Sequence, residues 1–181
     1  MALDTQLFLK LNGAIPAWLG FIFLGVTYAG SVYGLSVWLA IIAAMSRSQR
    51  WLGLRYVASA LVTVAIINQI LKHVIGRPRP WRVLAAAHTY GPLEHDFSFP
   101  SAHATATFAL AVAVALWWPR ARWPALVAAV LVSFSRIAIG MHYPGDVLGG
   151  AVLGAVTSFC LFPWFARRAE DNSVSKNSTK G

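Results

Sequence analysis

Cysteine and charged side chains are both scarce in this chain of 181 residues. The single cysteine, Cys160, excludes an internal disulfide and a metal site built from several cysteines. Charged residues make up 12% of the chain and hydrophobic residues 57%, so the chain could not cover the surface of a soluble domain with polar groups. The sequence therefore predicts an integral membrane protein, and its length leaves no room for a second domain of any size.

Acidic residues are the rarer charged type, with 6 against 15 basic residues and a formal net charge of +9. An excess of this kind is typical of proteins that bind nucleic acid. Here, however, the basic residues stand at the expected helix ends and in short loops, with no basic stripe along a soluble face. We therefore expect the bilayer as the partner, no nucleic acid and no obligate protein partner.

Six apolar stretches each come close to the ~20 residues needed to cross the hydrocarbon core. They are residues 15–30, 31–46, 54–75, 101–118, 123–140 and 146–166. Glycines interrupt the first two, which we expect to form a tilted hairpin, and residues 4–11 read as a short amphipathic helix at the surface. The sequence predicts an all-α bundle of six transmembrane helices with both termini cytoplasmic. Residues 1–166 would form the membrane domain, and the polar residues 167–181 a disordered cytoplasmic tail.

The basic residues indicate how such a bundle is oriented. On the side of the termini this topology places Lys10, Arg47, Arg50, Arg55, Arg120, Arg122, Arg167, Arg168, Lys176 and Lys180. The positive-inside rule makes that side the cytoplasm. The opposite side carries Lys72, Arg77, Arg79, Arg82 and Arg136, which a bound anion would explain. We therefore expect a site on the outer face of a bacterial inner membrane.

Two short polar groups interrupt the apolar pattern in the middle of the chain. Lys72 ends the third apolar stretch, and Arg79 follows a Gly-Arg-Pro turn that brings it back toward the membrane surface. Cations at a helix end also serve as snorkelling anchors. The second group, residues 100–103, begins the fourth stretch with Ser101 and His103. The free N–H groups of a helix start favour an anion, although the same residues would also suit an ordinary helix cap.

A third polar group follows the fifth stretch. Arg136 precedes a turn, and His142 stands four residues before Asp146. At this spacing the carboxylate can accept a hydrogen bond from one imidazole nitrogen and leave the other free to act as a nucleophile. The pair could equally cap a helix. Because ionisable groups beside a bilayer are costly, three such groups on one membrane face favour a phosphate site.

Together the three groups resemble the tripartite signature of the type 2 phosphatidic acid phosphatase family, which shares its site with vanadium haloperoxidases. The matching residues are Lys72 and Arg79-Pro80, then Pro100-Ser101-Ala102-His103, then Ser135-Arg136, His142 and Asp146. The resemblance implies a lipid phosphatase that needs no metal or other cofactor. In it His142 would form a phosphohistidine, Asp146 would orient His142, and His103 would be the general acid.

The same resemblance assigns the phosphate contacts. The phosphoryl oxygens would be held by Lys72, Arg79, Ser101, Ala102 and Arg136. The family usually has glycine where this chain has Ala102, but a backbone N–H serves an oxyanion in either case, so we expect activity to survive. Arg77 also precedes a proline and is a plausible auxiliary contact.

Residues 81–99 carry four side chains of the types that bind metals, His88, Glu94, His95 and Asp96, which could suggest a metal site. We expect a polar surface instead, on a loop that covers the pocket and meets the lipid headgroup. Residues 95–101 are similar to small bacterial undecaprenyl-diphosphate phosphatases, which favours that lipid as substrate. The alternatives are phosphatidylglycerophosphate, phosphatidate or lipid A, and, in a different class, a membrane transporter or scaffold.

Overall fold

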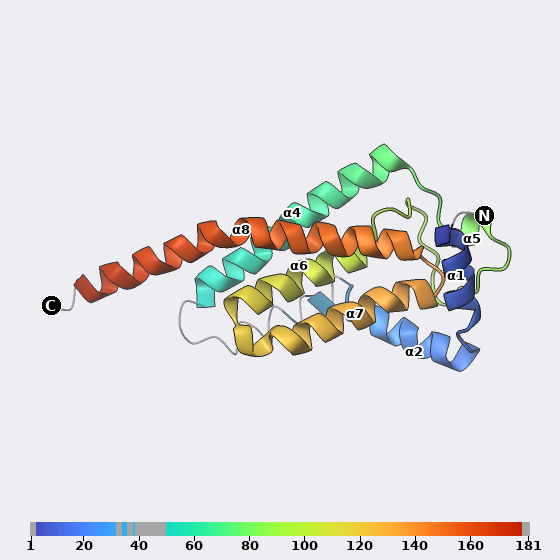
Figure 1. Cartoon of the computed structure of the whole chain (residues 1–181), viewed down its shortest axis with the longest axis horizontal. Coiled ribbons are helices and arrows are strands. Elements are labelled where there is room, and N and C mark those ends of the chain that lie inside the picture. Colours follow the sequence, from blue (N-terminus) through green and yellow to red (C-terminus); the bar gives the residue numbers. More distant parts are fainter. Residues whose placement is uncertain (1–2, 32–33, 36–37, 39–49, 179–181) are drawn as a thin grey trace.

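In this computed structural model, which describes residues 3–31, 34–35, 38 and 50–178, every regular element is a helix. The elements are α1 (Leu3–Gly13), α2 (Ala17–Tyr28), α4 (Arg50–Ile75), α5 (Pro80–Val83), α6 (Ala102–Trp117), the short 3₁₀ helix η1 (Pro119–Ala121), α7 (Arg122–Ala138) and α8 (Pro144–Ser178) (Figure 1). The all-α prediction is confirmed. The second predicted stretch, 31–46, falls largely outside the described residues.

Helix α6 is the centre of the bundle and packs against α4, α7 and α8. Two glycines of α8 permit the close approach to α6. A Cβ on Gly150 would lie 2.7 Å from the carbonyl oxygen of Ser101, and a Cβ on Gly154 would collide with the carbonyl oxygen of Thr105. Small residues at a helix interface let two backbones come together in this way. The contact holds the starts of α6 and α8 side by side.

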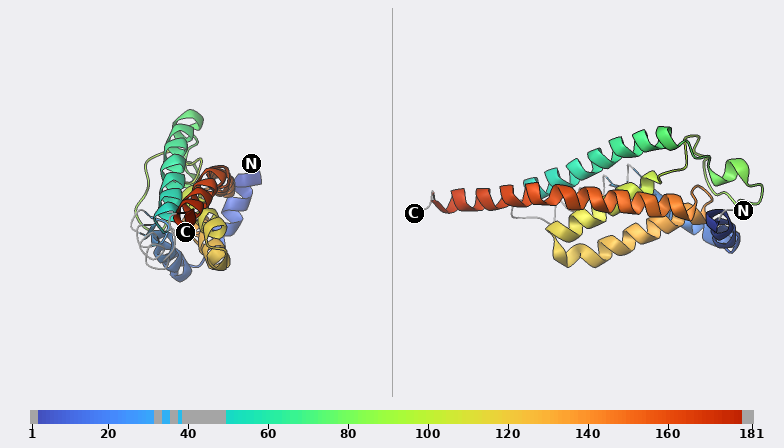
Figure 2. Two further views of the ribbon diagram at one scale, coloured as in Figure 1. Left: turned by 90° about the vertical axis from the view of Figure 1, so that its left-hand side faces the viewer. Right: turned by 45° about the horizontal axis from the view of Figure 1, so that its top comes forward.

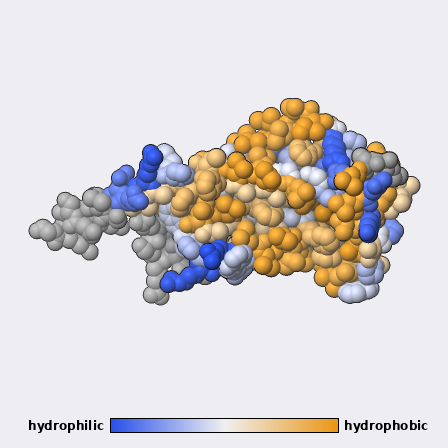
Figure 3. Space-filling view, in the orientation of Figure 1, coloured by the Kyte–Doolittle hydropathy of each residue, from blue (hydrophilic) through white to orange (hydrophobic). Residues whose placement is uncertain are grey.

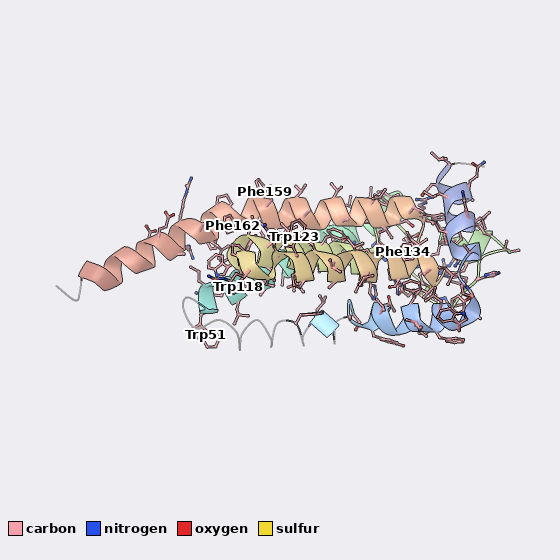
Figure 4. All side chains as sticks on the ribbon, turned by 60° about the horizontal axis from the view of Figure 1, so that its bottom comes forward. Trp51, Trp118, Trp123, Phe134, Phe159 and Phe162 are labelled. Carbon is pink, nitrogen blue, oxygen red and sulfur yellow. The ribbon has the colours of Figure 1, made fainter. Side chains whose placement is uncertain are left out.

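Among the residues that the structure describes, three helical stretches are long and apolar enough to cross a membrane: Trp51–Val83, Pro119–Ala138 and Pro144–Asp171. The pair α1 and α2, bent by 109°, makes a fourth if it counts as one span, and α6 is a shorter apolar helix. An apolar belt covers the middle of the molecule, with hydrophilic residues at both ends (Figure 3). Trp51 and Trp123, both largely exposed, lie toward the end of the bundle opposite α1 (Figure 4), as expected at a membrane interface.

Helix α1 lies across one end of the bundle, whereas α8 carries the C-terminus beyond the other end (Figures 1 and 2). The sequence predicts both termini on one side. The difference arises at the bend before α2, which has only 12 residues. Its last turn is still level with the end of α7, because Thr27 accepts a hydrogen bond from Arg136 at 2.9 Å. The chain has therefore not crossed the bundle by Tyr28.

Helix α8 also continues past Arg167 to Ser178. The backbone of residues 167–178 is therefore helical, in place of the disorder expected for this tail. Its cytoplasmic location stays a prediction.

Candidate active site

The three polar groups meet at the end of the bundle that α1 covers. Helices α4 and α7 end there, and α6 and α8 begin there (Figure 1). Gly76, with φ +61°, ends α4 and turns the chain toward Arg79, which precedes α5. The amide of Ser101 donates to the carbonyl oxygen of Asp146 at 3.1 Å, and this bond joins the starts of α6 and α8. Helix ends that share one level thus bring distant parts of the sequence together.

His142 is buried in the turn between α7 and α8. Its Nε2 lies 3.1 Å from Nη1 of Arg79. Because a guanidinium can only donate, this contact requires a lone pair on Nε2 and leaves the ring proton on Nδ1. Nδ1 lies 3.7 Å from Oδ2 of Asp146. Burial, reinforced by the positive charges of Arg79 and Arg136, lowers the pKa of His142 well below its usual value, so the imidazole is neutral at pH 7.

Asp146 is fully buried and held on several sides. Arg77 donates to its Oδ1 at 2.7 Å, while the hydroxyl of Ser98 and the amide of Tyr143 donate to Oδ2. The other arm of Arg77 pairs with Asp4 of α1 at 2.6 Å. The sequence left open whether Arg77 contacts the phosphate. In the structure it is a partner of the Asp146 carboxylate. The sequence did not predict the contact of Ser98 with Asp146, because a single serine in a loop forms no recognisable motif.

Lys72, Arg79 and Arg136 are buried cations that share two carboxylate partners. Asp96 pairs with Lys72 and Arg79, and Glu94 pairs with Arg79 and Arg136. Burial alone would raise the pKa of each carboxyl. The charges of Arg136 and Arg79 outweigh it and lower the pKa of Glu94 to about 2. Hydrogen bonds from Lys72 and Arg79 do the same for Asp96, to about 2.

The polar surface expected for the loop is therefore wrong for Glu94 and Asp96, which turn inward to the cations. The other two of these four residues have different partners. The backbone of His88 is bound by Asn12 of α1, and the carbonyl oxygen of His95 accepts from Arg82. The part of the chain that the structure describes contains no group of three or more histidine, cysteine, aspartate or glutamate side chains placed to hold a metal.

The remaining predicted residues stand at the start of α6. Ser101 is buried, and its hydroxyl caps the helix by accepting from the amide of Ala104 at 3.5 Å. Ala102 is exposed, and His103 is partly buried in the first turn of the helix. A Cβ on Gly30 would lie 3.3 Å from the His103 ring, so the segment after α2 borders this histidine.

Comparison with known proteins adds a family to this geometry. Residues 53–170 match the family described as the PAP2 superfamily. The undecaprenyl-diphosphatase of Sulfolobus acidocaldarius is 32% identical over 133 residues, which cover 71% of this chain and 64% of that protein. The lipid A 4'-phosphatase of Bacteroides thetaiotaomicron is 30% identical over 166 residues, covering 84% of this chain and 72% of that protein.

Solved structures agree with these sequence matches. The crystal structure of Aquifex aeolicus LpxE superimposes with a TM-score of 0.81 at 26% identity, over 90% of this chain and 96% of the other. The match spans 64% of the Sulfolobus acidocaldarius protein and 50% of another relative, the undecaprenyl-diphosphatase BcrC of Bacillus subtilis, which is less than two thirds of either length.

Proposed function

Because this chain belongs to the PAP2 superfamily, we propose that it is a membrane phosphatase that hydrolyses a phosphate or diphosphate headgroup of a lipid. One observation carries this function. The unprotonated Nε2 of His142 faces Arg79, and Arg79 belongs to a cluster of three buried cations. A neutral imidazole beside such a cluster can attack a phosphorus atom whose oxygens the cations hold.

In the first step Nε2 of His142 forms a bond to phosphorus as the bond from phosphorus to the leaving oxygen breaks. His103 donates a proton to that oxygen. Lys72, Arg79 and Arg136 stabilise the charge on the phosphoryl oxygens, together with the hydroxyl of Ser101 and the amide of Ala102. Asp146 stabilises the positive charge that develops on the His142 ring.

In the second step water attacks the phosphohistidine. His103, which has lost its proton, accepts one from the water, while the bond from phosphorus to Nε2 breaks and inorganic phosphate leaves. Nε2 regains its lone pair, and the ring is ready for another cycle. The chain's own cations supply the charge stabilisation in both steps, so we expect no metal or other cofactor to be required.

Undecaprenyl diphosphate is the substrate we propose, to be converted to undecaprenyl phosphate. The relative named undecaprenyl-diphosphatase supports it. Lipid A is the second candidate, since a relative of similar identity is named lipid A 4'-phosphatase. Both are lipids with an anionic headgroup at the membrane surface, where the ends of four helices place the cations.

We further propose that the site faces the exterior of a bacterial inner membrane and that the C-terminal end of α8 lies in the cytoplasm. Arg120 and Arg122 adjoin the start of α7, away from the site, and Arg55 and Arg168 line one pocket between α4 and α8. Their excess at that end supports the orientation. This proposal does not include the six spans and the cytoplasmic N-terminus expected from the sequence, because α1 lies at the end of the bundle that holds the site.

Purified full-length protein in detergent tests the activity. Phosphate release from undecaprenyl diphosphate, lipid A, phosphatidylglycerophosphate and phosphatidate would rank the substrates. His142→Ala should abolish both turnover and the acid-labile phosphate trapped on the protein, while His88→Ala serves as a matched control outside the site. Substantial turnover by His142→Ala would refute the covalent mechanism. A transporter would instead tolerate this change better than loss of Lys72.

Labelling of single cysteines tests the orientation. In a Cys160→Ala background, an impermeant thiol reagent applied to intact cells should label Ala87→Cys and spare Ser48→Cys. The reverse pattern would overturn the outward-facing site and, with it, an external pool of substrate.

A further inference from the structure

The two inward-turned carboxylates pair with all three cations of the cluster. Each of their four oxygens pairs with one cation: those of Glu94 with Arg136 and Arg79, and those of Asp96 with Arg79 and Lys72. Two carboxylates carry the charge of a phosphate dianion. Their oxygens therefore stand where the oxygens of a bound phosphoryl group would have to be.

Arg79 has no unoccupied donor to offer a phosphate in this structure. A guanidinium has five N–H donors. Nε donates to the carbonyl oxygen of Asp96, Nη1 donates to the carbonyl oxygen of Met141 and to Nε2 of His142, and Nη2 donates to Glu94 and Asp96. All five donors are used. A phosphate oxygen can reach Arg79 only by replacing one of these acceptors, and among them the side chains of Glu94 and Asp96 are the ones open to solvent.

The backbone of the loop is held by hydrogen bonds at its ends and also at Tyr90, His95 and Asp96 between them, but two of its side chains border solvent. Asn12 binds the backbone of His88 through both of its amide atoms, and the amide of Ser98 donates to the carbonyl oxygen of Arg77 at 2.8 Å. The side chains of Glu94 and Asp96 are 36% and 48% exposed. They can leave the cations for solvent while the ends of the loop stay in place.

We propose that Glu94 and Asp96 compete with phosphate for the three cations and must be displaced before a phosphoryl group binds. This inference rests on the proposed function, which assigns those cations to phosphoryl oxygens. A free phosphate must displace both carboxylates with its own charge alone. A lipid phosphate meets the same competition but adds the binding energy of a chain that stays in the hydrocarbon, so it keeps a useful affinity. The dissociation constants of both ligands rise by the same factor, and the carboxylates thus select against inorganic phosphate, including the product of the reaction, whose own affinity is the weaker.

Direct binding of inorganic phosphate to the purified full chain tests this selection. Glu94→Gln with Asp96→Asn keeps the shape of both side chains and removes their charge. The dissociation constant for phosphate, from calorimetry or phosphorus NMR, should fall roughly tenfold or more, the scale of a charge-assisted hydrogen bond taken from the competitor. The phosphate inhibition constant and the KM for the lipid should fall with it by similar factors.

Glu170→Gln with Asp171→Asn is the matched control, since it changes net charge equally at the far end of α8, where both residues are exposed. The control should leave phosphate affinity unchanged. If the carboxylates only hold the cations in position, phosphate binding to the double variant will be unchanged or weaker, and the selection is refuted. Should the double variant not fold, each single variant must show part of the tightening. Lipid hydrolysis by the wild type separately decides whether the proposed function stands.

Discussion

Arg77 offers a test of whether the support of Asp146 matters for catalysis. Arg77→Gln removes the guanidinium that donates to Asp146 at 2.7 Å and to Asp4 at 2.6 Å. A hydrogen bond to a charged group contributes about 1.5–3 kcal/mol, and about 1.4 kcal/mol corresponds to a tenfold change in rate. If the contact acts through His142 in the transition state, kcat falls by roughly 10- to 100-fold. KM should hardly change, because Arg77 is not among the cations that pair with Glu94 and Asp96.

Initial rates of phosphate release over a range of substrate concentrations and pH would separate the two constants. Arg82→Gln is the matched control, an exposed arginine that donates to the carbonyl oxygen of His95. Asp4→Asn should give a smaller loss of kcat, because it leaves the contact between Arg77 and Asp146 intact. A rise in KM at constant kcat would mean that Arg77 binds substrate. Unchanged kinetics would mean that Ser98 and the Tyr143 amide suffice.

Three further outcomes are expected. The pKa values of Glu94 and Asp96 are lowered from 4.5 and 3.8 to about 2, so the ionised carboxylates stabilise the folded protein at pH values above 4.5. Thermal stability should therefore fall as the pH drops from 4.5 toward about 2, and should fall less in the Glu94→Gln, Asp96→Asn variant. Chelators should leave activity intact and vanadate should inhibit, which phosphate-release assays would check; activity that needs an added divalent ion contradicts the cation-only site. Gly154→Ala should cost roughly 1–3 kcal/mol of unfolding free energy against Thr105, whereas Gly13→Ala, which meets open space, should not.

The residues of the signature could be placed from the sequence because they stand at helix ends. Lys72 near the end of α4, Ser101 before α6 and Asp146 at the start of α8 each follow from an apolar run and its break. Once these helices pack side by side, their ends share one level. Local pattern therefore sufficed to predict that the three cations meet and that His142 lies beside Asp146, but not the distance of 3.7 Å between Nδ1 and Oδ2, which is longer than the hydrogen bond expected from the spacing.

Contacts made by loops could not be found in this way. Glu94 and Asp96 look like surface residues in the sequence, since nothing local shows that the loop folds back over Arg79. The partnership of Ser98 with Asp146 likewise depends on the path of the whole chain. The sequence held one signal, since its six acidic residues are outnumbered by fifteen basic ones. In the structure four of the six pair with cations at the site end: Asp4, Glu94, Asp96 and Asp146.

The predicted topology of the N-terminal segment differs from the structure for a related reason. The stretch 15–30 has the composition of a membrane span, but Pro16 stands at the sharp bend between α1 and α2. Hydropathy indicates that a segment suits the hydrocarbon of the membrane, but not in which direction the segment runs. The contact of Asp4 with Arg77, which holds α1 at the site end, is a tertiary one that no local window contains.

The position of α1 has a practical consequence for work with this protein. Asp4 accepts from Arg77 and from the amide of Gly145, so the first turn of the chain is one hydrogen-bonded partner away from the carboxylate behind the nucleophile. An affinity tag or fluorescent protein fused at this end would strain that turn and lower kcat without unfolding the bundle. The 35 residues of α8 span roughly 50 Å, so a fusion at the opposite end stands far from the chemistry.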